Sequence, residues 1–244
     1  MKNQVKGNRK IKLKSIKTGL FFFKFQFLFF TLFNILPATA AATEPVISVV
    51  QSIENSNQWK GITSRLESAG VNYCVIPLNS VKDTGDWGSR TVLFLPNVEK
   101  LTPSQVITLE EWVSKGGRII ASGPVGSLSA PGVRRLMKNL LGGYWGFSLN
   151  SAQQLQPSKS KSQRWANNKK LIGEVRGGVV VPNFPSQTAA VWNEKDNSTA
   201  VIATERSTFF GWRWGVDTAA NPQLDSAWLQ AALKRHAKSP SAVK

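Results

Sequence analysis

One stretch, residues 91–124, constrains the fold of this chain more than any other, and it reads TVLFLPNVEKLTPSQVITLEEWVSKGGRIIASGP. An apolar run at 92–95 and a second at 119–121 flank a segment whose apolar residues recur at helical spacing. This pattern predicts a strand, a helix and a second strand. Because a helix then joins the two strands, we expect them to lie parallel in one sheet.

The helix within this stretch has clear signals at both ends. Thr102 is the expected N-cap, Pro103 suits the first helical position, and Gln105 completes a capping box with Thr102. Gly116 and Gly117 then end the helix. The apolar face expected to pack on the sheet consists of Val106, Leu109 and Val113.

Residues 46–141 as a whole follow the order β-α-β-β-α-β-α. The further elements are a strand at 46–50, a helix at 57–69, a strand at 71–76, and a helix that starts at Pro131 and ends at Gly142-Gly143. Such an order predicts an α/β fold with a mainly parallel, flavodoxin-like sheet and helices on both faces.

Beyond Gly143 short strand-like pieces replace this alternation. Residues 153–170 among them are polar and basic, so we expect a surface loop or partial disorder there. Asn221 and Pro222 start a final helix, which ends in a tail at 238–244. The strand-like pieces are expected to form antiparallel additions in the C-terminal third, and they lie at 144–149, 179–181, 189–192, 200–204 and 208–214.

The amino terminus is typical of an export signal. The first 42 residues hold eight Lys and Arg and no acid, and eight of the thirteen Phe lie in an apolar run at 20–36. Ala38-Thr39-Ala40 then supplies an A-x-A cleavage site. We therefore predict a signal peptide at 1–42 and export to the periplasm, cell envelope or exterior. An uncleaved membrane anchor is the alternative, since the run approaches the roughly 20 residues that a spanning helix needs.

The formal net charge of +17 falls to +9 without the first 42 residues, because 23 basic and 14 acidic residues remain. A basic exported domain suits an anionic envelope polysaccharide or lipid surface as a partner. Nucleic acid is not expected, because no nucleic-acid-binding motif accompanies the charge and the compartment is wrong. Membrane contact is expected only through an uncleaved amino-terminal segment, and the sequence leaves the oligomeric state open.

Cysteine and histidine are scarce. Cys74 is the one cysteine and His236 the one histidine, so neither a disulfide within the chain nor a zinc-like ligand set can form. Cys74 lies in the apolar run at 71–76, where we expect a buried structural thiol. The sequence accordingly predicts no metal and no cofactor.

The spacing of a buried strand ending in Leu95-Pro96, a helix after Leu101-Thr102, the Gly116-Gly117 stop and a further strand resembles the class I glutamine amidotransferase-like fold. It looks most like the non-catalytic branch, whose domains accompany bacterial glycoside hydrolases. Examples are the trimerisation domain of some β-galactosidases and the region before the barrel of secreted glycosylhydrolase-like proteins. The resemblance covers about 45 to 236 and implies a core at 45–143, a β-rich extension at 144–215 and a closing helix at 222–236, within one domain at 43–237.

The departures from that family bear on function. Its catalytic members carry a cysteine on a tight strand-to-helix turn, with a histidine and an acid to activate it. The most similar turn here reads Ser122-Gly123-Pro124-Val125-Gly126, without a cysteine, and His236 lies on the final helix. In the glycosylhydrolase-like proteins a barrel begins near or after residue 236, where this sequence stops. The resemblance therefore implies a non-catalytic accessory or interaction domain, with a polysaccharide or a hydrolase as its partner.

Five residues are weak ligand-binding candidates, because four of them follow predicted strands and one is a loop aromatic. Glu99 also supports an alternative function, a glycoside- or ester-hydrolysing enzyme in which Asp83 or Asp86 supplies the second acid. Either an open crevice or one filled by residues 144–192 is compatible with these positions. The five candidates are Asn79, Asn97, Glu99, Gly123 and Trp165.

Two further patterns have a structural and a functional interpretation. Gly123 and Gly126 lie between a strand and a helix as in phosphate-binding turns, but Pro124 removes a backbone donor, so we expect a structural turn. Phe210, Trp212 and Trp214 alternate onto one face of a strand. They form either a glycan-stacking surface or a core face, and we expect the core.

Overall fold

The computed structural model describes residues 47–158, 168–193 and 196–237, all within the unit Thr43–Lys244. Four α-helices accompany the strands there: α1 (Trp59–Ser68), α2 (Pro103–Ser114), α3 (Pro131–Leu141) and α4 (Pro222–Ala237). The strands are β1 (Ile47–Gln51), β2 (Tyr73–Pro77), β3 (Val92–Pro96), β4 (Arg118–Ser122), β5 (Gly143–Ser148), β6 (Gln153–Pro157), β7 (Gly173–Val175), β8 (Gly178–Pro182), β9 (Gln187–Trp192), β10 (Thr199–Ala203) and β11 (Ser207–Phe210).

Nine of these strands form one sheet in the order β2-β1-β3-β4-β11-β10-β9-β6-β7. The first five run parallel to one another, and antiparallel pairing begins between β11 and β10. The predicted α/β fold, with a parallel sheet and antiparallel additions, is therefore confirmed. One detail differs: β11 was expected among the antiparallel pieces, but it extends the parallel part by pairing with β4.

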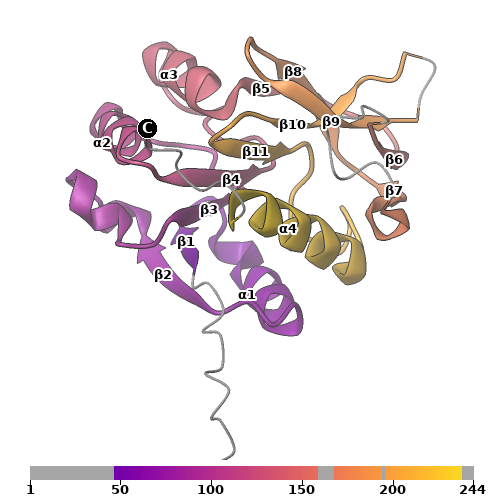
Figure 1. The fold of residues 1–244 in the computed structure, drawn as a ribbon, viewed down its shortest axis with the longest axis horizontal. Helices are drawn as coiled ribbons and strands as arrows, with labels where there is room; N and C mark the ends of the chain where they lie inside the picture. The colour runs from indigo at the N-terminus through magenta and orange to yellow at the C-terminus, as the bar shows by residue number, and fades with distance from the viewer. Residues whose placement is uncertain (1–46, 159–167, 194–195, 238–244) are drawn as a thin grey trace, which may run out of the picture. The chain divides into compact units, whose positions relative to one another are not determined.

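Helices cover both faces of the sheet, as predicted. Successive strand residues face opposite sides, so Val49 belongs to the core cluster under α1 and α4, whereas Val50 belongs to the cluster under α2 and α3. Figure 1 shows α1 and α4 along one side of the sheet and α2 and α3 along the other. Within the described residues no helix combines the length and apolar character needed to cross a membrane.

The ends of α2 agree with the sequence signals. The Thr102 side chain accepts a hydrogen bond from the backbone N–H of Gln105, and the Gln105 side chain accepts one from the backbone N–H of Thr102. Gly117 lies flat against the Trp112 ring, since an added Cβ would come within 2.2 Å of it. The predicted capping box and stop are therefore confirmed, and Gly117 has an additional packing reason to be glycine.

Residues 153–157 correct the expectation of a loop over 153–170. They form β6, which pairs with both β9 and β7 in the sheet. Leu155 is fully buried in the core cluster although its neighbours in sequence are polar. Pairing with two neighbouring strands thus stabilises β6, although its local sequence does not predict a strand. A short 3₁₀ helix, η4 (Lys169–Leu171), follows, and 159–167 lie outside the described residues.

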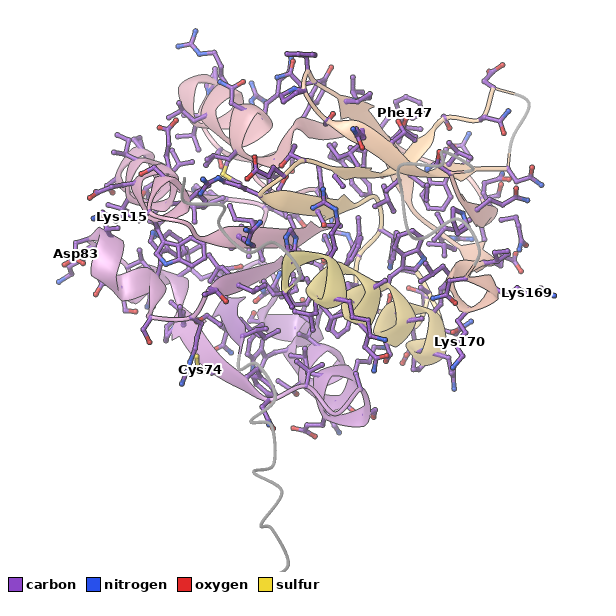
Figure 2. All side chains as sticks on the ribbon, in the orientation of Figure 1. Cys74, Asp83, Lys115, Phe147, Lys169 and Lys170 are labelled. Carbon is purple, nitrogen blue, oxygen red and sulfur yellow. The ribbon has the colours of Figure 1, made fainter. Side chains whose placement is uncertain are left out.

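Cys74 is exposed, so the prediction of a buried thiol is wrong. The residue lies on β2, which is the edge strand of the sheet, and its neighbour Val75 is 42% exposed. An apolar run predicts a strand but does not reveal that the strand has a partner on one side only. Figure 2 shows Cys74 at this outer edge.

Strands β5 and β8 form a second, two-stranded antiparallel sheet. Gly142, in the left-handed conformation with φ of 77°, ends α3 and turns the chain directly into β5. Val180 of β8 packs in the same core cluster as Ile202 of β10. Because the turn at Gly142 joins them directly, helix α3 and β5 are neighbours in space, as Figure 1 shows.

Candidate functional site

The carboxyl ends of β1 and β3 mark the expected ligand site, because parallel sheets of this order open there between the strands whose connections diverge. In this chain Asn55 fills that position and is fully buried. Its Nδ2 donates to the carbonyl of Val50 at 3.1 Å and to that of Pro96 at 2.7 Å. Its Oδ1 accepts from the backbone N–H of Ser52 at 2.9 Å. The side-chain amide thus joins the two strand ends where a crevice would begin.

Asn97, the first residue after β3, extends this network. Its Nδ2 donates to Gln58 Oε1 at 2.7 Å and to the Trp214 carbonyl at 3.0 Å, and its Oδ1 accepts from Ser122 Oγ at 3.1 Å. The backbone has a φ of 55°, which asparagine tolerates better than most residues. Asn97 is fully buried, so its polar atoms serve the fold rather than a ligand.

Residues 211–217, the segment after β11, cross the same edge of the sheet. The segment reaches Asn97 through the Trp214 carbonyl, and it approaches α1 so closely that a Cβ on Gly61 would lie 2.4 Å from the Gly215 oxygen. This contact brings the segment from β11 to the helix that follows β1. The 211–217 segment therefore fills the carboxyl edge near β3, β4 and β11, in place of the 144–192 segment considered from the sequence, whereas the edge beyond β1 and β2 opens into a cavity of about 530 Å³.

The buried carboxylate of Asp225 on α4 holds this segment in place. It accepts from Trp212 Nε1 at 2.7 Å and from the backbone N–H of Gly215 at 2.9 Å. It also forms an ion pair with Arg65 of α1, which in turn contacts the largely exposed Asp217 at 2.6 Å. Charge-assisted hydrogen bonds of this kind order a segment strongly when they are buried.

Glu99 does not stand free at this edge. Its Oε1 lies 2.5 Å from Arg213 Nη1, and the Glu99 side chain is 15% exposed. The ion pair links the loop after β3 to the 211–217 segment. A glycosidase needs its carboxyl groups free to reach the scissile bond, and the Glu99 carboxylate is engaged by Arg213 instead.

The second acids proposed for Glu99 are held elsewhere. Asp83 caps the 3₁₀ helix η3 (Thr84–Trp87) by accepting from the backbone N–H of Gly85 at 2.8 Å. Hydrogen bonds from the backbone N–H groups of Lys82 and Asp83 lower the pKa of Asp86. Helix η3 packs against α2, where Thr84 donates to Glu111. Both acids thus have local structural partners and neither forms a pair with Glu99.

The turn after β4 uses its backbone donors internally, which agrees with the structural interpretation of its glycines. Gly123 and Gly126 have φ of 70° and 72°. The Gly126 N–H donates to the Val98 carbonyl and the Leu128 N–H to the Glu99 carbonyl, both at 2.9 Å. A phosphate would need such donors free. Gly123 also lies directly under Asn97, since an added Cβ would be 2.8 Å from Oδ1.

Asn79 is separate from the other candidates. It lies in the 3₁₀ helix η2 (Leu78–Ser80), is exposed, and lines a cavity of about 530 Å³ beside the ends of β1 and β2. Ser52 and Lys100 line the same cavity. The structure therefore brings Asn97, Glu99 and Gly123 together in one network and leaves Asn79 outside it. Trp165 lies outside the described residues.

A cysteine–histidine pair is not assembled. His236 Nε2 is 3.1 Å from Thr208 Oγ1 on β11, whereas Cys74 lies on β2, and three strands separate β2 from β11. At the usual strand spacing this corresponds to about 19 Å. Among the described residues no cluster of three or more His, Cys, Asp or Glu could hold a metal ion.

The aromatic residues at the end of β11 and directly after it belong to the core, as expected. Phe210, Trp212 and Trp214 are fully buried, and Phe210 stacks on Trp212 with ring centroids 5.0 Å apart. Trp228 of α4 meets Trp212 edge to face at 5.9 Å. These rings are not available to stack on a sugar.

Three residues of the network were not predicted from the sequence. Asn55 follows β1 after a short turn, and asparagine at such a position is a known turn signal that could have been noticed. Gln58 and Arg213 act through partners 39 and 114 residues away, so no local pattern identifies them.

Comparison with known proteins shows the fold. No family model matches the chain, and no curated protein matches its sequence. Solved structures do match, among them α-L-fucosidase isoenzyme 2 from Paenibacillus thiaminolyticus, at 14% identity and a TM-score of 0.57, over 80% of this chain and 33% of that chain. A catalytic mutant of a GH42 β-galactosidase from G. stearothermophilus matches at 10% identity and a TM-score of 0.59, over 80% and 30%.

A ThuA-like protein from Bacteroides uniformis matches over nearly its full length, with 10% identity, a TM-score of 0.65, and coverage of 84% of this chain and 97% of that chain. This chain spans about a third of the length of the two glycosidases. These similarities show the fold alone: an α/β fold that this chain shares with the ThuA-like protein and with part of the two glycosidase chains.

Proposed function

We propose that this protein is an exported, non-catalytic accessory domain that binds a polysaccharide or a hydrolase partner in cell-envelope processing. The observation that carries the proposal is that the carboxyl edge is filled at the ends of β3, β4 and β11 and at the point between β1 and β3 where Asn55 lies. Related folds place ligands at this edge, but here Asn55, Asn97 and the 211–217 segment occupy it through buried hydrogen bonds.

The ion pair of Glu99 with Arg213 supports the same proposal. Hydrolysis of a glycoside needs one protonated and one ionised carboxyl group on either side of the scissile bond. Glu99 forms an ion pair with Arg213, and the Asp83 and Asp86 side chains accept hydrogen bonds from backbone N–H groups at η3. The alternative of a hydrolytic enzyme that uses Glu99 therefore has no favourable observation among the described residues.

The link to polysaccharides rests on the fold and on charge. The fold occurs in an α-L-fucosidase and in a β-galactosidase, of which this chain spans about a third. The positive charge of residues 43–244 suits an anionic polymer outside the cell. Export itself is a prediction from residues 1–42, and amino-terminal sequencing of the secreted protein tests it: an end at Ala41 or Thr43 supports cleavage.

Two assays on the full chain test this function together. Co-sedimentation with purified envelope polysaccharides measures binding, and incubation with a panel of aryl glycosides and esters measures turnover. We expect sedimentation with at least one acidic polymer and no turnover above buffer. Turnover that disappears in Glu99→Gln would establish the enzyme instead. Absence of sedimentation with every polymer would remove the polysaccharide as the partner, and failure to capture a hydrolase on the immobilised chain as well would remove the accessory role.

A further inference from the structure

A second cavity lies between α3 and β5. Its volume is about 600 Å³, within the range of about 300 to 1,000 Å³ typical of small-ligand sites. It forms because Gly142 turns the chain sharply, so that the end of α3 and the start of β5 diverge as two walls. The turn at 125–127 closes the third side.

The α3 wall of the cavity is strongly basic. Arg134, Arg135 and Lys138 line it, and none of the described residues that line the cavity is acidic. None of the ion pairs formed within the described residues involves these three side chains. Unpaired cations gathered around a concave surface raise the local concentration of anions.

The floor and the β5 wall are apolar and aromatic. Met137 and Leu141 of α3 are buried beneath the cavity, while Tyr144 and Trp145 of β5 line its side. Lys138 Nζ lies 5.4 Å from the Tyr144 ring centroid, which fixes a cation beside an aromatic face. Trp145 is held in turn against Gly178, where an added Cβ would come within 2.3 Å of the indole.

A basic wall on α3 opposite an aromatic wall on β5 favours a particular class of ligand. A sugar ring presents C–H faces that pack on aromatic rings, and a carboxylate or phosphate on the same ring pairs with guanidinium and ammonium groups. A neutral sugar would leave the three cations without partners. A simple inorganic anion would leave the aromatic wall unused.

We propose that the cavity between α3 and β5 binds an acidic saccharide, with Arg134, Arg135 and Lys138 on the acid group and Tyr144 and Trp145 against the ring. This inference rests on the proposed function for its biological setting, since it names the class of polysaccharide that the accessory domain would engage. The cavity adjoins the turn after β4 through Val125 and Gly126, but its described lining residues include none of the candidates Asn79, Asn97, Glu99 and Gly123.

Calorimetric titration of the full chain tests the ligand class directly. The probes are trigalacturonate, a phosphorylated trisaccharide and a neutral galactose trisaccharide. We expect saturable binding of an acidic probe and an affinity for the neutral probe at least about tenfold weaker. The stronger of the two acidic probes identifies the acid group. Equal binding of the neutral probe, or no binding of any probe, would overturn the proposal, and neither result depends on a variant.

A matched pair of triple variants locates the site. One variant changes Arg134, Arg135 and Lys138 to Gln, and the control changes the exposed Lys60, Lys169 and Lys170 to Gln, so both lose the same charge. Figure 2 shows Lys169 and Lys170 away from α3, beside α4, whose amino-terminal half contacts this segment. We expect at least about tenfold weaker binding in the first and less than about twofold in the second. If both variants bind the acidic probe equally weakly, the probe is attracted by the overall charge of the protein, and the assignment of the binding site to the cavity is overturned.

A second matched pair tests the aromatic wall. Tyr144 and Phe147 both lie on β5 and are 43% and 60% exposed, but only Tyr144 lines the cavity. Tyr144→Ala is expected to weaken binding by up to about tenfold. Phe147→Ala is expected to leave it unchanged, and the reverse order of effects would contradict the assignment.

Failure of this inference and failure of the proposed function give different results. If the chain sediments with an acidic envelope polymer and the first triple variant does so equally well, the assignment of the binding site to the cavity is wrong, while the proposed accessory role is supported. If trigalacturonate binds in the cavity but no envelope polymer sediments the chain, the assignment of the cavity is supported and the proposed binding of an envelope polysaccharide is wrong.

Discussion

Asn97→Ala is the substitution that tests the filled edge most sharply. The change removes the donors to Gln58 and to the Trp214 carbonyl and the acceptor for Ser122. It also places alanine at a φ of 55°. The predicted effect therefore combines lost buried hydrogen bonds with backbone strain.

The two contributions can be estimated separately. A buried polar group left without its partner costs about 1 to 3 kcal/mol, and the Trp214 carbonyl and Ser122 hydroxyl are two such groups. Alanine in the left-handed region costs about 1 kcal/mol more than asparagine. We expect Asn97→Ala to lower the free energy of unfolding by about 4 kcal/mol, a large part of the 5 to 15 kcal/mol typical of a domain.

The chain offers a matched control for the strain. Asn197 has a similar φ of 45° but is exposed, so Asn197→Ala should cost only about 1 kcal/mol. Asn97→Gly should lie between the two, because glycine accepts the conformation but still loses the hydrogen bonds. Guanidinium unfolding followed by tryptophan fluorescence gives the three values. If Asn97→Ala and Asn197→Ala cost the same, the network contributes nothing and the interpretation of the edge is refuted.

Three further outcomes are expected. Burial and two neighbouring arginines lower the pKa of His236 from 6.5 to about 3, so between these values the unfolded chain binds a proton that the folded chain does not. Stability should therefore fall by about 2 kcal/mol from pH 7.5 to pH 5, and unfolding titrations of His236→Gln should lack this loss. Asp225→Ala should lower the free energy of unfolding by about 3 to 5 kcal/mol, because it removes the buried partner of Arg65. Asp217→Ala changes a carboxylate that is 92% exposed and should lower the free energy of unfolding by less than about 1 kcal/mol in the same assay. Gly61→Ala should lower the melting temperature by several degrees through its backbone clash, while Gly132→Ala, with open space around it, should raise it slightly; equal shifts would contradict the close approach of 211–217 to α1.

The sequence predicted those parts of the fold that local signals determine. Thr102 and Gln105, three residues apart, predict the start of α2 because their side chains can form a capping box. The order of strands and helices through residue 141 follows from the spacing of apolar residues. It did not predict β6, whose one fully buried apolar residue, Leu155, owes its environment to β9 and β7. It also gave no indication that Cys74 lies on an edge strand, because edge position depends on the pairing of the whole sheet.

The sequence placed candidate residues after predicted strands but did not predict their partners, and a role for them in ligand binding stays a prediction. Asn97, Glu99 and Gly123 do lie together at the carboxyl edge, since strand ends of a parallel sheet meet there. What occupies the edge depends on a contact between Asn97 and Trp214, which are 117 residues apart. No pattern within a window of the sequence encodes such a pairing, and the basic cavity beside β5 likewise requires α3 and β5 to be placed together first.

The central claim is that this domain holds a polysaccharide without cutting it. One experiment tests it: the full chain is titrated with polygalacturonate, and the recovered polymer is then sized by mass spectrometry. The account predicts saturable binding and an unchanged distribution of chain lengths. A shortened polymer, formed by the unmodified protein but not by Glu99→Gln, would contradict it.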